Sequence, residues 1–409
     1  MTKGQVQKVH SIQYATNNTK AAALWFQERF GFVEVAERTM ELGARMVCAR
    51  VLRSGDIVLE LISPLVSLTD AEIDSVLAKQ PSHELKKKLA QVYGGPPLSE
   101  VIECCLVQRY LRCHNDGVFG IRFVVDSVAQ CMDQAQADCS VVMDATTNAE
   151  VTMGSVMIPR IDLLHTFVEL NGFGGYLPGF TMVDCDNKAK FLVERVDHIV
   201  QNYTYNQIER QAKIYIDSFG FHRFWSVDEN DISTANTALR SVVVALPDEL
   251  LKMPLNEPVT SHYRGQIEEF YDYFGGAGVQ HIAFSTDDII ATVSQLKLRG
   301  VEFNTIGGEY YQNLRQRFID DDIDLGIDLA KLEKLHILVD YDVGSRNPQL
   351  KACDYLLQIF TQPVVDRPTL FFEIIQRRGH NGFGKGTFKG LFETIERQQQ
   401  LRGTLSRVD

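Results

Sequence analysis

The stretch Gly278-Val279-Gln280-His281-Ile282-Ala283-Phe284 repeats, in altered form, the earlier stretch Gly117-Val118-Phe119-Gly120-Ile121-Arg122-Phe123. Both are short runs rich in apolar residues, which predicts buried strands. Two further pairs recur in the same order: Val9-His10-Ser11-Ile12 with Val196-Asp197-His198-Ile199, and Phe30-Gly31-Phe32 with Phe219-Gly220-Phe221. The sequence therefore predicts a duplicated chain.

Each half contains two units in which a strand is followed by one helix-period segment and about three more strands. This pattern predicts an α+β fold of four βαβββ modules arranged as two similar halves. Helices are expected over residues 21–28 and 207–216. Turn residues from Gly174 to Phe180, followed by mixed polar residues to about Lys190, predict the linker. The expected halves are residues 1–180 and 190–409.

Three strand-like segments of the second half contain His198, His281 and Glu373. Two imidazoles and one carboxylate are the ligand set of mononuclear non-haem iron(II) oxygenases, although residue type alone also permits zinc. A single histidine in an apolar strand is usually a core residue. Here, however, the first half has Ser11 where the second has His198, and Gly120 where the second has His281. A third match, of residues 165–170 with residues 369–374, places Glu169 at the position of Glu373. Coordination explains the difference better than packing, because it removes the cost of burying ionisable groups.

Composition narrows the function classes. The chain has 409 residues, 45% hydrophobic and 23% charged, and a net charge of -12. These values are typical of a globular protein that repels phosphate backbones, so we expect a small-molecule substrate, no nucleic acid and no membrane. No signal peptide or apolar run of membrane-spanning length is evident, which predicts a cytoplasmic protein. The eight cysteines form no CxxC pair, so reduced thiols are expected, with Cys104-Cys105 packed in a strand.

The second half resembles the 4-hydroxyphenylpyruvate dioxygenase family, whose fold is the vicinal-oxygen-chelate fold. The resemblance is carried by Val196-Asp197-His198-Ile199-Val200, Phe221-His222-Arg223-Phe224-Trp225-Ser226-Val227-Asp228, Met253-Pro254-Leu255-Asn256-Glu257-Pro258, Gly275-Gly276-Ala277-Gly278-Val279-Gln280-His281, Asp366-Arg367-Pro368-Thr369-Leu370-Phe371-Phe372-Glu373 and Gly382-Phe383-Gly384-Lys385-Gly386-Thr387-Phe388. The first half is similar more loosely and departs at His114-Asn115-Asp116. Near the site, Thr387 stands where relatives commonly have Asn.

The resemblance implies that each half is an open barrel-like sheet, that one Fe(II) per chain is bound by His198, His281 and Glu373, and that the chain forms a homodimer. It also implies that 4-hydroxyphenylpyruvate and O2 are converted to homogentisate and CO2 in tyrosine and phenylalanine catabolism. The polar residues implied to act on the substrate are Gln266, Gln280, Gln358, Ser241 and Asn256. The aromatic residues expected to bind its ring are Phe360, Phe371, Phe383 and Phe388.

Three other segments have simpler interpretations. Five glycines between Gly379 and Gly390 precede an amphipathic segment from about Phe388 to Arg402, which predicts a C-terminal lid helix. Phosphate binding by these glycines is disfavoured, because they follow no βα turn. The acidic run around Asp322 is expected to be a solvated loop. Residues 64–115 are expected to form a surface insertion, part helical from Ser82 to Val92.

Two alternatives remain open at this stage. The first is 4-hydroxymandelate synthase, which resembles the same family and is implied to use the same metal ligands and substrate. The second is a non-catalytic protein of the same fold that sequesters a ligand. Such a protein has no need to keep both histidines and Glu373 together.

Overall fold

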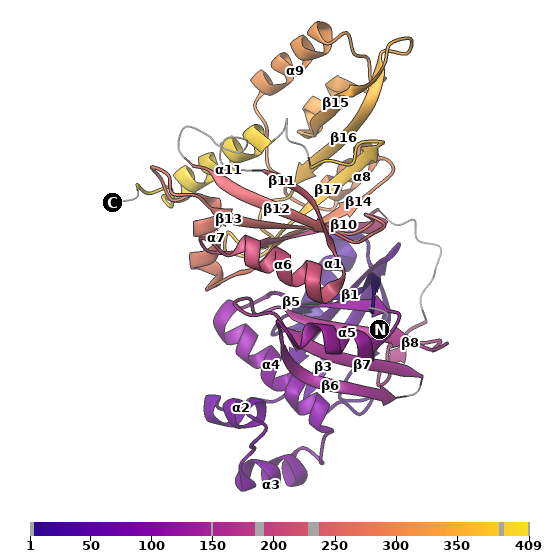
Figure 1. Ribbon diagram of the computed structural model, residues 1–409, viewed down its shortest axis with the longest axis vertical. Helices are drawn as coiled ribbons and strands as arrows, with labels where there is room; N and C mark the ends of the chain where they lie inside the picture. Colours follow the sequence, from indigo (N-terminus) through magenta and orange to yellow (C-terminus); the bar gives the residue numbers. More distant parts are fainter. Residues whose placement is uncertain (1–3, 149, 185–191, 228–236, 384–387, 408–409) are drawn as a thin grey trace.

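The computed structural model describes residues 4–148, 150–184, 192–227, 237–383 and 388–407 (Figure 1). Two mixed sheets form its frame, one from each half of the chain. The first sheet has the order β6-β7-β8-β5-β1-β4-β3-β2-β9, and the second has the order β11-β12-β13-β10-β14-β17-β16-β15. Apart from the edge strand β9, the two orders are the same, which confirms the predicted α+β fold of two similar halves.

The first half consists of two βαβββ modules. The first module is β1 (Val6–Ala15), α1 (Thr19–Phe30), β2 (Val33–Arg38), β3 (Val47–Ser54) and β4 (Ile57–Pro64); the second is β5 (Gly117–Val125), α5 (Val128–Ala135), β6 (Ser140–Asn148), β7 (Val151–Met157) and β8 (Leu164–Leu170). Three helices lie between the two modules: α2 (Asp70–Leu77), α3 (His83–Val92) and α4 (Leu98–His114). The short strand β9 (Thr181–Met182) follows the second module.

The second half repeats this plan with different insertions. Its modules are β10 (Arg195–Asn202), α6 (Ile208–Phe219), β11 (His222–Val227), β12 (Leu239–Ala245) and β13 (Lys252–Pro258), then β14 (Gly278–Ser285), α8 (Ile289–Leu298), β15 (Leu338–Asn347), β16 (Ala352–Phe360) and β17 (Phe371–Arg378). The added helices are α7 (Gln266–Phe274), α9 (Gly308–Asp320), α10 (Leu329–Leu335) and the C-terminal α11 (Phe388–Arg402). The domain boundaries at residues 180 and 190 stay a prediction.

The repeated Phe-Gly-Phe motif ends the corresponding helices α1 and α6. Gly31 and Gly220 cap them in the left-handed conformation, with φ of 72° and 76°. Glycine adopts this conformation without the strain that a side chain adds, so the chain can turn at once into the next strand. The flanking phenylalanines enter the core, which is why the motif recurs in both halves.

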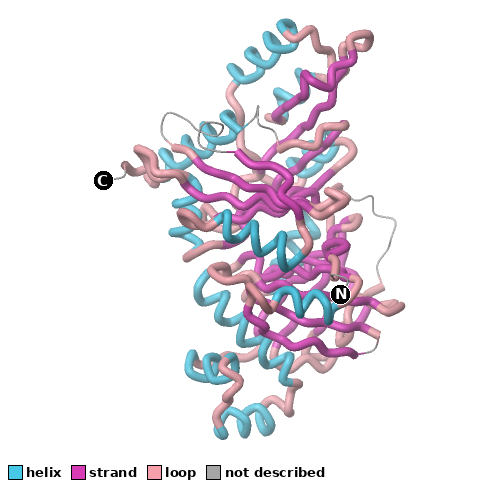
Figure 2. Tube along the Cα trace, in the orientation of Figure 1, coloured by secondary structure: helices cyan, strands magenta, loops and turns pink. Residues whose placement is uncertain are grey.

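The two halves are joined by a common apolar core, and α1 and α6 lie where they meet (Figure 2). Phe30 of α1 packs against Phe372 of β17, with ring centroids 5.2 Å apart, and Phe219 of α6 packs against Phe167 of β8 at 5.3 Å. Because strand side chains alternate, Phe372 faces this core while Glu373 faces the opposite side of the second sheet. Helix packing on one side therefore leaves the other side for a site.

Two expectations about residues 64–115 are wrong. Cys104 and Cys105 lie on α4 and not in a strand, and α4 is largely buried, so only part of the segment is a surface insertion. The apolar positions Val101, Cys104, Cys105 and Leu111 recur at helical spacing, and this face packs against the first sheet in a second core cluster.

Other expectations agree with the structure. Each described cysteine is a free thiol. Asp322 is exposed and pairs with Arg346 and Lys351, as expected of a solvated acidic run. Among the described helices, none has both the length and the apolar content needed to cross a membrane.

Candidate metal centre

His198, Ala283 and Glu373 form a row across the three central strands of the second sheet. His198 of β10 lies opposite Ala283 of β14, and Ala283 lies opposite Glu373 of β17. His281 is two residues before Ala283, so its side chain faces the same side of the sheet. The small side chain of Ala283 leaves room between the other three, and the row explains how residues far apart in sequence converge.

The three predicted ligands are close together and buried. Nε2 of His198 and Nε2 of His281 lie 3.1 Å and 3.3 Å from Oε2 of Glu373. In the described parts of the chain, this is the group of His, Cys, Asp or Glu that could hold a metal, with one ligand atom of each within 4.8 Å of the others. Oε1 of Glu373 is buried and has no hydrogen-bond donor among the described residues. A buried carboxylate oxygen without a donor is costly, so the donor set fits a cation.

A β-bulge precedes each metal-facing histidine. In β10, Val196 and His198 lie opposite consecutive residues of β14, so Asp197 is the extra residue of the first bulge. In β14, His281 and Val279 lie opposite the consecutive residues Val200 and Gln201 of β10, so Gln280 is the extra residue of the second bulge. Bulges redirect side chains beside functional sites. Here they bring Oδ1 of Asp197 within 2.8 Å of Nδ1 of His198, and Oε1 of Gln280 within 2.9 Å of Nδ1 of His281.

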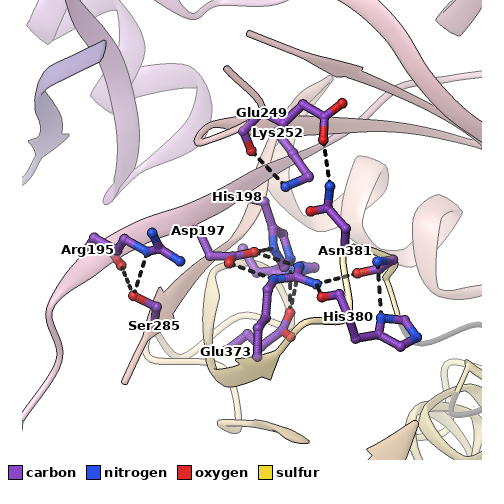
Figure 3. A network of polar contacts seen from close by, with 12 residues as sticks. Arg195, Asp197, His198, Glu249, Lys252, Ser285, Glu373, His380 and Asn381 are labelled. Atoms are coloured by element: carbon purple, nitrogen blue, oxygen red, sulfur yellow. Dashed lines mark hydrogen bonds and ion pairs between the residues drawn. The ribbon is translucent and has the colours of Figure 1, made fainter. Parts of the chain in front are cut away.

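Asp197 and Gln280 each accept a hydrogen bond from Nδ1 of the following histidine, and so direct Nε2 of each imidazole toward Glu373. This is the usual outer support of histidine ligands, and it fixes the tautomer and the ring plane. The anchors differ in charge, since one is a carboxylate and the other a neutral amide. Asp197 lies between His198 and Arg377, which donates to it from Nε and Nη2 at 2.8 Å each. Figure 3 shows Asp197, His198 and Glu373 side by side, with His380 and Asn381 next to them.

Electrostatics differ between the two imidazoles. Burial lowers the pKa of His281. Burial acts in the same direction at His198, but the charge of Glu373 and the bond to Asp197 outweigh it and raise the pKa of His198. At Glu373, burial is outweighed by His198, which lowers the pKa of the carboxyl group. The carboxylate is thus ionised and ready to bind a cation.

A cavity of about 60 Å³ opens beside the triad. The described residues that line it include all three predicted metal ligands, the polar residues Gln266, Gln280, Gln358, Ser241 and Asn256, and the aromatic residues Phe360, Phe371 and Phe383. Phe388 begins α11, but its side chain and Thr387 lie outside the described part of the chain. Among the described lining residues, none is Lys or Arg, and a cation held by the three ligand groups would supply positive charge for an anionic ligand.

Aromatic rings hold the histidines from the side. Phe371 stacks on His281 with centroids 4.7 Å apart and planes inclined by 19°, and Phe383 meets His198 edge-on at 5.2 Å. Trp225, which was not predicted, stacks on Phe383 at 5.8 Å. Trp225 and Phe383 also line a larger outer cavity of about 460 Å³ that contains Asp340 and His380. These two rings therefore form the wall between the inner and outer cavities.

Asp197 and Arg377 were also missed by sequence reasoning. The available signals were weak. Asp197 directly precedes a ligand. Arg377 lies four residues after Glu373, which places the side chains of Glu373 and Arg377 on one face of β17. Neither signal predicts a bulge. The bulge depends on the pairing of β10 with β14, which a single strand does not reveal.

The first half has a different set of residues at the corresponding positions. Its ladders place Ser11, Arg122 and Thr166 in the row of His198, Ala283 and Glu373. The predicted match of Glu169 with Glu373 is therefore wrong by three residues. Glu169 instead accepts from the backbone N–H of Val128 at the start of α5. Short apolar strands allow several registers, and only pairing selects one.

Buried ion pairs occupy this part of the first half. Arg122 pairs with Glu60, and the hydroxyl of Tyr176 donates to Glu60 at 2.6 Å. A side chain at Gly120 would approach Oε1 of Gln13 at 2.7 Å, so the position of His281 is closed here. The described residues of the first half thus contain no counterpart of the metal-facing cluster.

The fold and the metal-facing cluster define a protein of the vicinal-oxygen-chelate class. Residues 195–324 match the Glyoxalase/Bleomycin resistance protein/Dioxygenase superfamily. The chain is 38% identical over 404 residues to 4-hydroxyphenylpyruvate dioxygenase of Coccidioides posadasii (strain C735), covering 96% of this chain and 93% of that protein. It is 37% identical to the Dictyostelium discoideum protein of the same name, covering 96% and 98%. The chain belongs to the 4-hydroxyphenylpyruvate dioxygenase family.

A solved structure also matches nearly the whole chain. It is a triple mutant of 4-hydroxymandelate synthase from Streptomyces coelicolor, with a TM-score of 0.76 and 24% identity, covering 97% of this chain and 99% of that chain. At this identity the similarity concerns the fold alone. It confirms that both halves adopt the arrangement seen in that protein.

Proposed function

We propose that this protein is a 4-hydroxyphenylpyruvate dioxygenase that uses one Fe(II) per chain, held by His198, His281 and Glu373. The observation that supports this most directly is the composition of the cavity. Three ligand groups face one side of it, while its described remainder is uncharged and combines amide, hydroxyl, aliphatic and aromatic side chains. Such a cavity suits an aryl keto acid whose carboxylate needs a cation and whose ring needs apolar walls.

Two imidazoles and one carboxylate occupy one face of an octahedral ion and leave positions for a chelating substrate and dioxygen. Bound Fe(II) supplies the redox chemistry, namely oxygen activation coupled to decarboxylation of the keto acid. The net reaction, 4-hydroxyphenylpyruvate and O2 to homogentisate and CO2, needs no other reductant. Zinc offers the same coordination but no redox chemistry.

The chain's own residues orient the substrate and restrict water. Gln266, Gln280 and Gln358 present amides that can donate or accept without adding charge. The amide of Gln280 is already committed to His281 and, at 3.5 Å, to Gln266, so we assign it mainly to ligand support. Ser241 and Asn256, which face each other across β12 and β13, are left to contact the substrate.

The aromatic residues hold the ring of the substrate. Phe360 and Phe371 line the cavity on the β16–β17 side, and Phe383 closes it beside His198. Offset or edge-on contacts of this kind contribute about 0.5–1.5 kcal/mol each beyond area burial, enough to orient a ring. We assign Phe388 to the same wall.

The deciding experiment is product analysis. Protein reconstituted anaerobically with Fe(II) is mixed with 4-hydroxyphenylpyruvate in air-saturated buffer, and oxygen uptake, metal content and products are measured together. Homogentisate formed in proportion to oxygen supports the proposal. Recovery of 4-hydroxymandelate would instead make the protein a synthase, and Fe(II) binding without oxygen uptake would favour ligand sequestration.

We propose further that the protein is cytoplasmic and acts as a homodimer that associates through the first half. Sedimentation of the purified protein tests the second point. A sedimentation mass near 46.2 kDa, that of one chain, would contradict it.

A further inference from the structure

Arg377 lies at a junction that the proposed chemistry does not itself require. It is at the end of β17, on the same face as Glu373, and its side chain is mostly buried, with 11% exposure. Its five donors form a planar fork that can bind groups in fixed directions. In this protein the two edges of the fork point to different parts of the site.

One edge of the guanidinium supports a metal ligand. Nε and Nη2 donate to the two oxygens of Asp197, each at 2.8 Å, and Oδ1 of Asp197 accepts from Nδ1 of His198 at 2.8 Å. The side chain of Asp197 is only 5% exposed, so this carboxylate depends on Arg377 for compensation of its charge.

The other edge supports the cavity wall. Nη1 donates to the backbone carbonyls of His380 at 3.1 Å and Gly382 at 2.5 Å. The next residue is Phe383, whose ring lies 5.8 Å from the guanidinium carbon and 5.2 Å from the ring of His198. The segment has two further attachments. Asn381 donates to Glu249 (Figure 3), and Nε2 of His380 lies 3.7 Å from Asp340.

We propose that Arg377 is a positioning residue that couples the orientation of the metal ligand His198 to the position of the Phe383 wall. A displacement of the wall pulls on the carbonyls that Nη1 holds, and the rigid fork transmits it to Asp197 and His198. The position of the wall and the alignment of the ligand are thus linked through one side chain. The inference depends on the proposed metal site, but it concerns residues outside the ligand set.

The test measures two quantities in one set of variants. The first is the affinity of the metal-free protein for Co(II), followed by its visible absorption. The second is the emission of Trp225, which stacks on Phe383 and reports its position. The chain has two tryptophans, so the measurements are made in a Trp25→Phe background.

Three variants separate the two edges of the fork. Asp197→Asn should lower Co(II) affinity about 10- to 100-fold, the usual effect of losing an outer support, and leave Trp225 emission unchanged. Phe383→Leu should change the emission with little effect on affinity. Arg377→Met should change both, because it releases both edges at once.

The matched control is Arg378→Met. Arg378 follows Arg377 on β17, but it is half exposed and contacts Asp287 at the surface, so neither quantity should change. Arg377→Lys, which keeps the charge without the fork, provides a second test if the Met variant fails to fold. It should show an intermediate loss of Co(II) affinity together with shifted emission.

The outcomes are distinct. Co(II) affinity of Arg377→Met within twofold of the parent, or parent-like emission, overturns the coupling. Full restoration of both quantities by Arg377→Lys also overturns it, because charge alone would then suffice. If the parent itself fails to bind one Co(II) per chain, the proposed metal site is wrong, which is a different result from failure of the coupling.

Discussion

Arg122 of β5 and Ala283 of β14 stand at equivalent positions in the two halves, since Arg122 lies opposite Ser11 and Ala283 lies opposite His198. In the second half the methyl group of Ala283 leaves space among three ligands. In the first half a guanidinium enters the corresponding region and pairs with Glu60. The first half therefore contains a cation of its own, the guanidinium of Arg122, whereas the second half has room for a bound ion.

Arg122→Ala should be strongly destabilising, because it leaves the fully buried Glu60 without its cation. Loss of one member of a buried pair typically costs about 3–5 kcal/mol. Denaturant unfolding should show this loss, and Arg122→Met combined with Glu60→Gln should recover part of it. Arg109→Met, which breaks an exposed pair with Asp74, should cost less than about 1 kcal/mol. Equal losses for Arg122→Ala and Arg109→Met would contradict the assigned role.

His281→Ala should remove most of the bound metal, because two ligands in a buried site do not offset the cost of desolvating the ion. Metal analysis after reconstitution should find less than about a tenth of the parent content, a loss in line with more than about 1.4 kcal/mol of binding free energy. His83→Ala, on the exposed face of α3, is the control. Full occupancy in His281→Ala would disprove the triad.

Arg402→Met should loosen the C-terminal helix. Arg402 donates to Glu269 at 2.8 Å, and the carboxylate is only 4% exposed. If this ion pair contributes about 1 kcal/mol to the attachment of α11, its loss raises the fraction of molecules with α11 detached roughly fivefold. More oxygen should then be consumed per homogentisate formed. Arg397→Met, also on α11 but exposed, should keep the parent ratio. An unchanged ratio in both variants would show that α11 does not seal the cavity.

The His165 imidazole should make the protein acid-labile. It accepts from the hydroxyl of Tyr215 at 2.8 Å, and burial lowers the pKa of His165 from 6.5 to about 4. The unfolded chain therefore binds the proton more readily than the folded chain. The contribution of neutral His165 to the free energy of unfolding is complete above about pH 6.5 and is lost as the pH falls toward about 4. Between about pH 7 and about pH 5, the free energy of unfolding should fall by about 2 kcal/mol.

Urea unfolding at both pH values tests this prediction. His165→Gln should reduce the pH dependence of the unfolding free energy, whereas His83→Gln should leave it unchanged. A His165→Gln variant with the full parental slope would place the acid sensitivity elsewhere, for example at His10, whose pKa burial also lowers to about 4.

The duplication was the best guide to the fold. Equivalent strands, the Phe-Gly-Phe helix ends and the placement of His198 and His281 follow from aligning the halves, whereas Glu373 was identified by its residue type and by the family resemblance. Register was less accessible: Glu169 seemed to match Glu373, although the ladder pairs Thr166 there. Gln280 was predicted as a site residue through the family resemblance, but its role as a support for His281 was not. That role and the position of Asp197 depend on bulges, and Arg377 acts through a tertiary contact, so no local pattern reveals them. Helical spacing in α4 was detectable, but the surrounding polar patches concealed it.

The internal ion pair of Arg122 with Glu60 has a consequence for how the protein ages. The first half contains both members of this pair as soon as it folds, whereas the second half, with its proposed metal site, gains its last stabilising partner only from a bound metal ion. Chains that lack the ion are therefore weakened unevenly. Proteolysis of such chains should begin in the C-terminal half, so that a shortage of metal shortens the lifetime of the protein as well as lowering its activity.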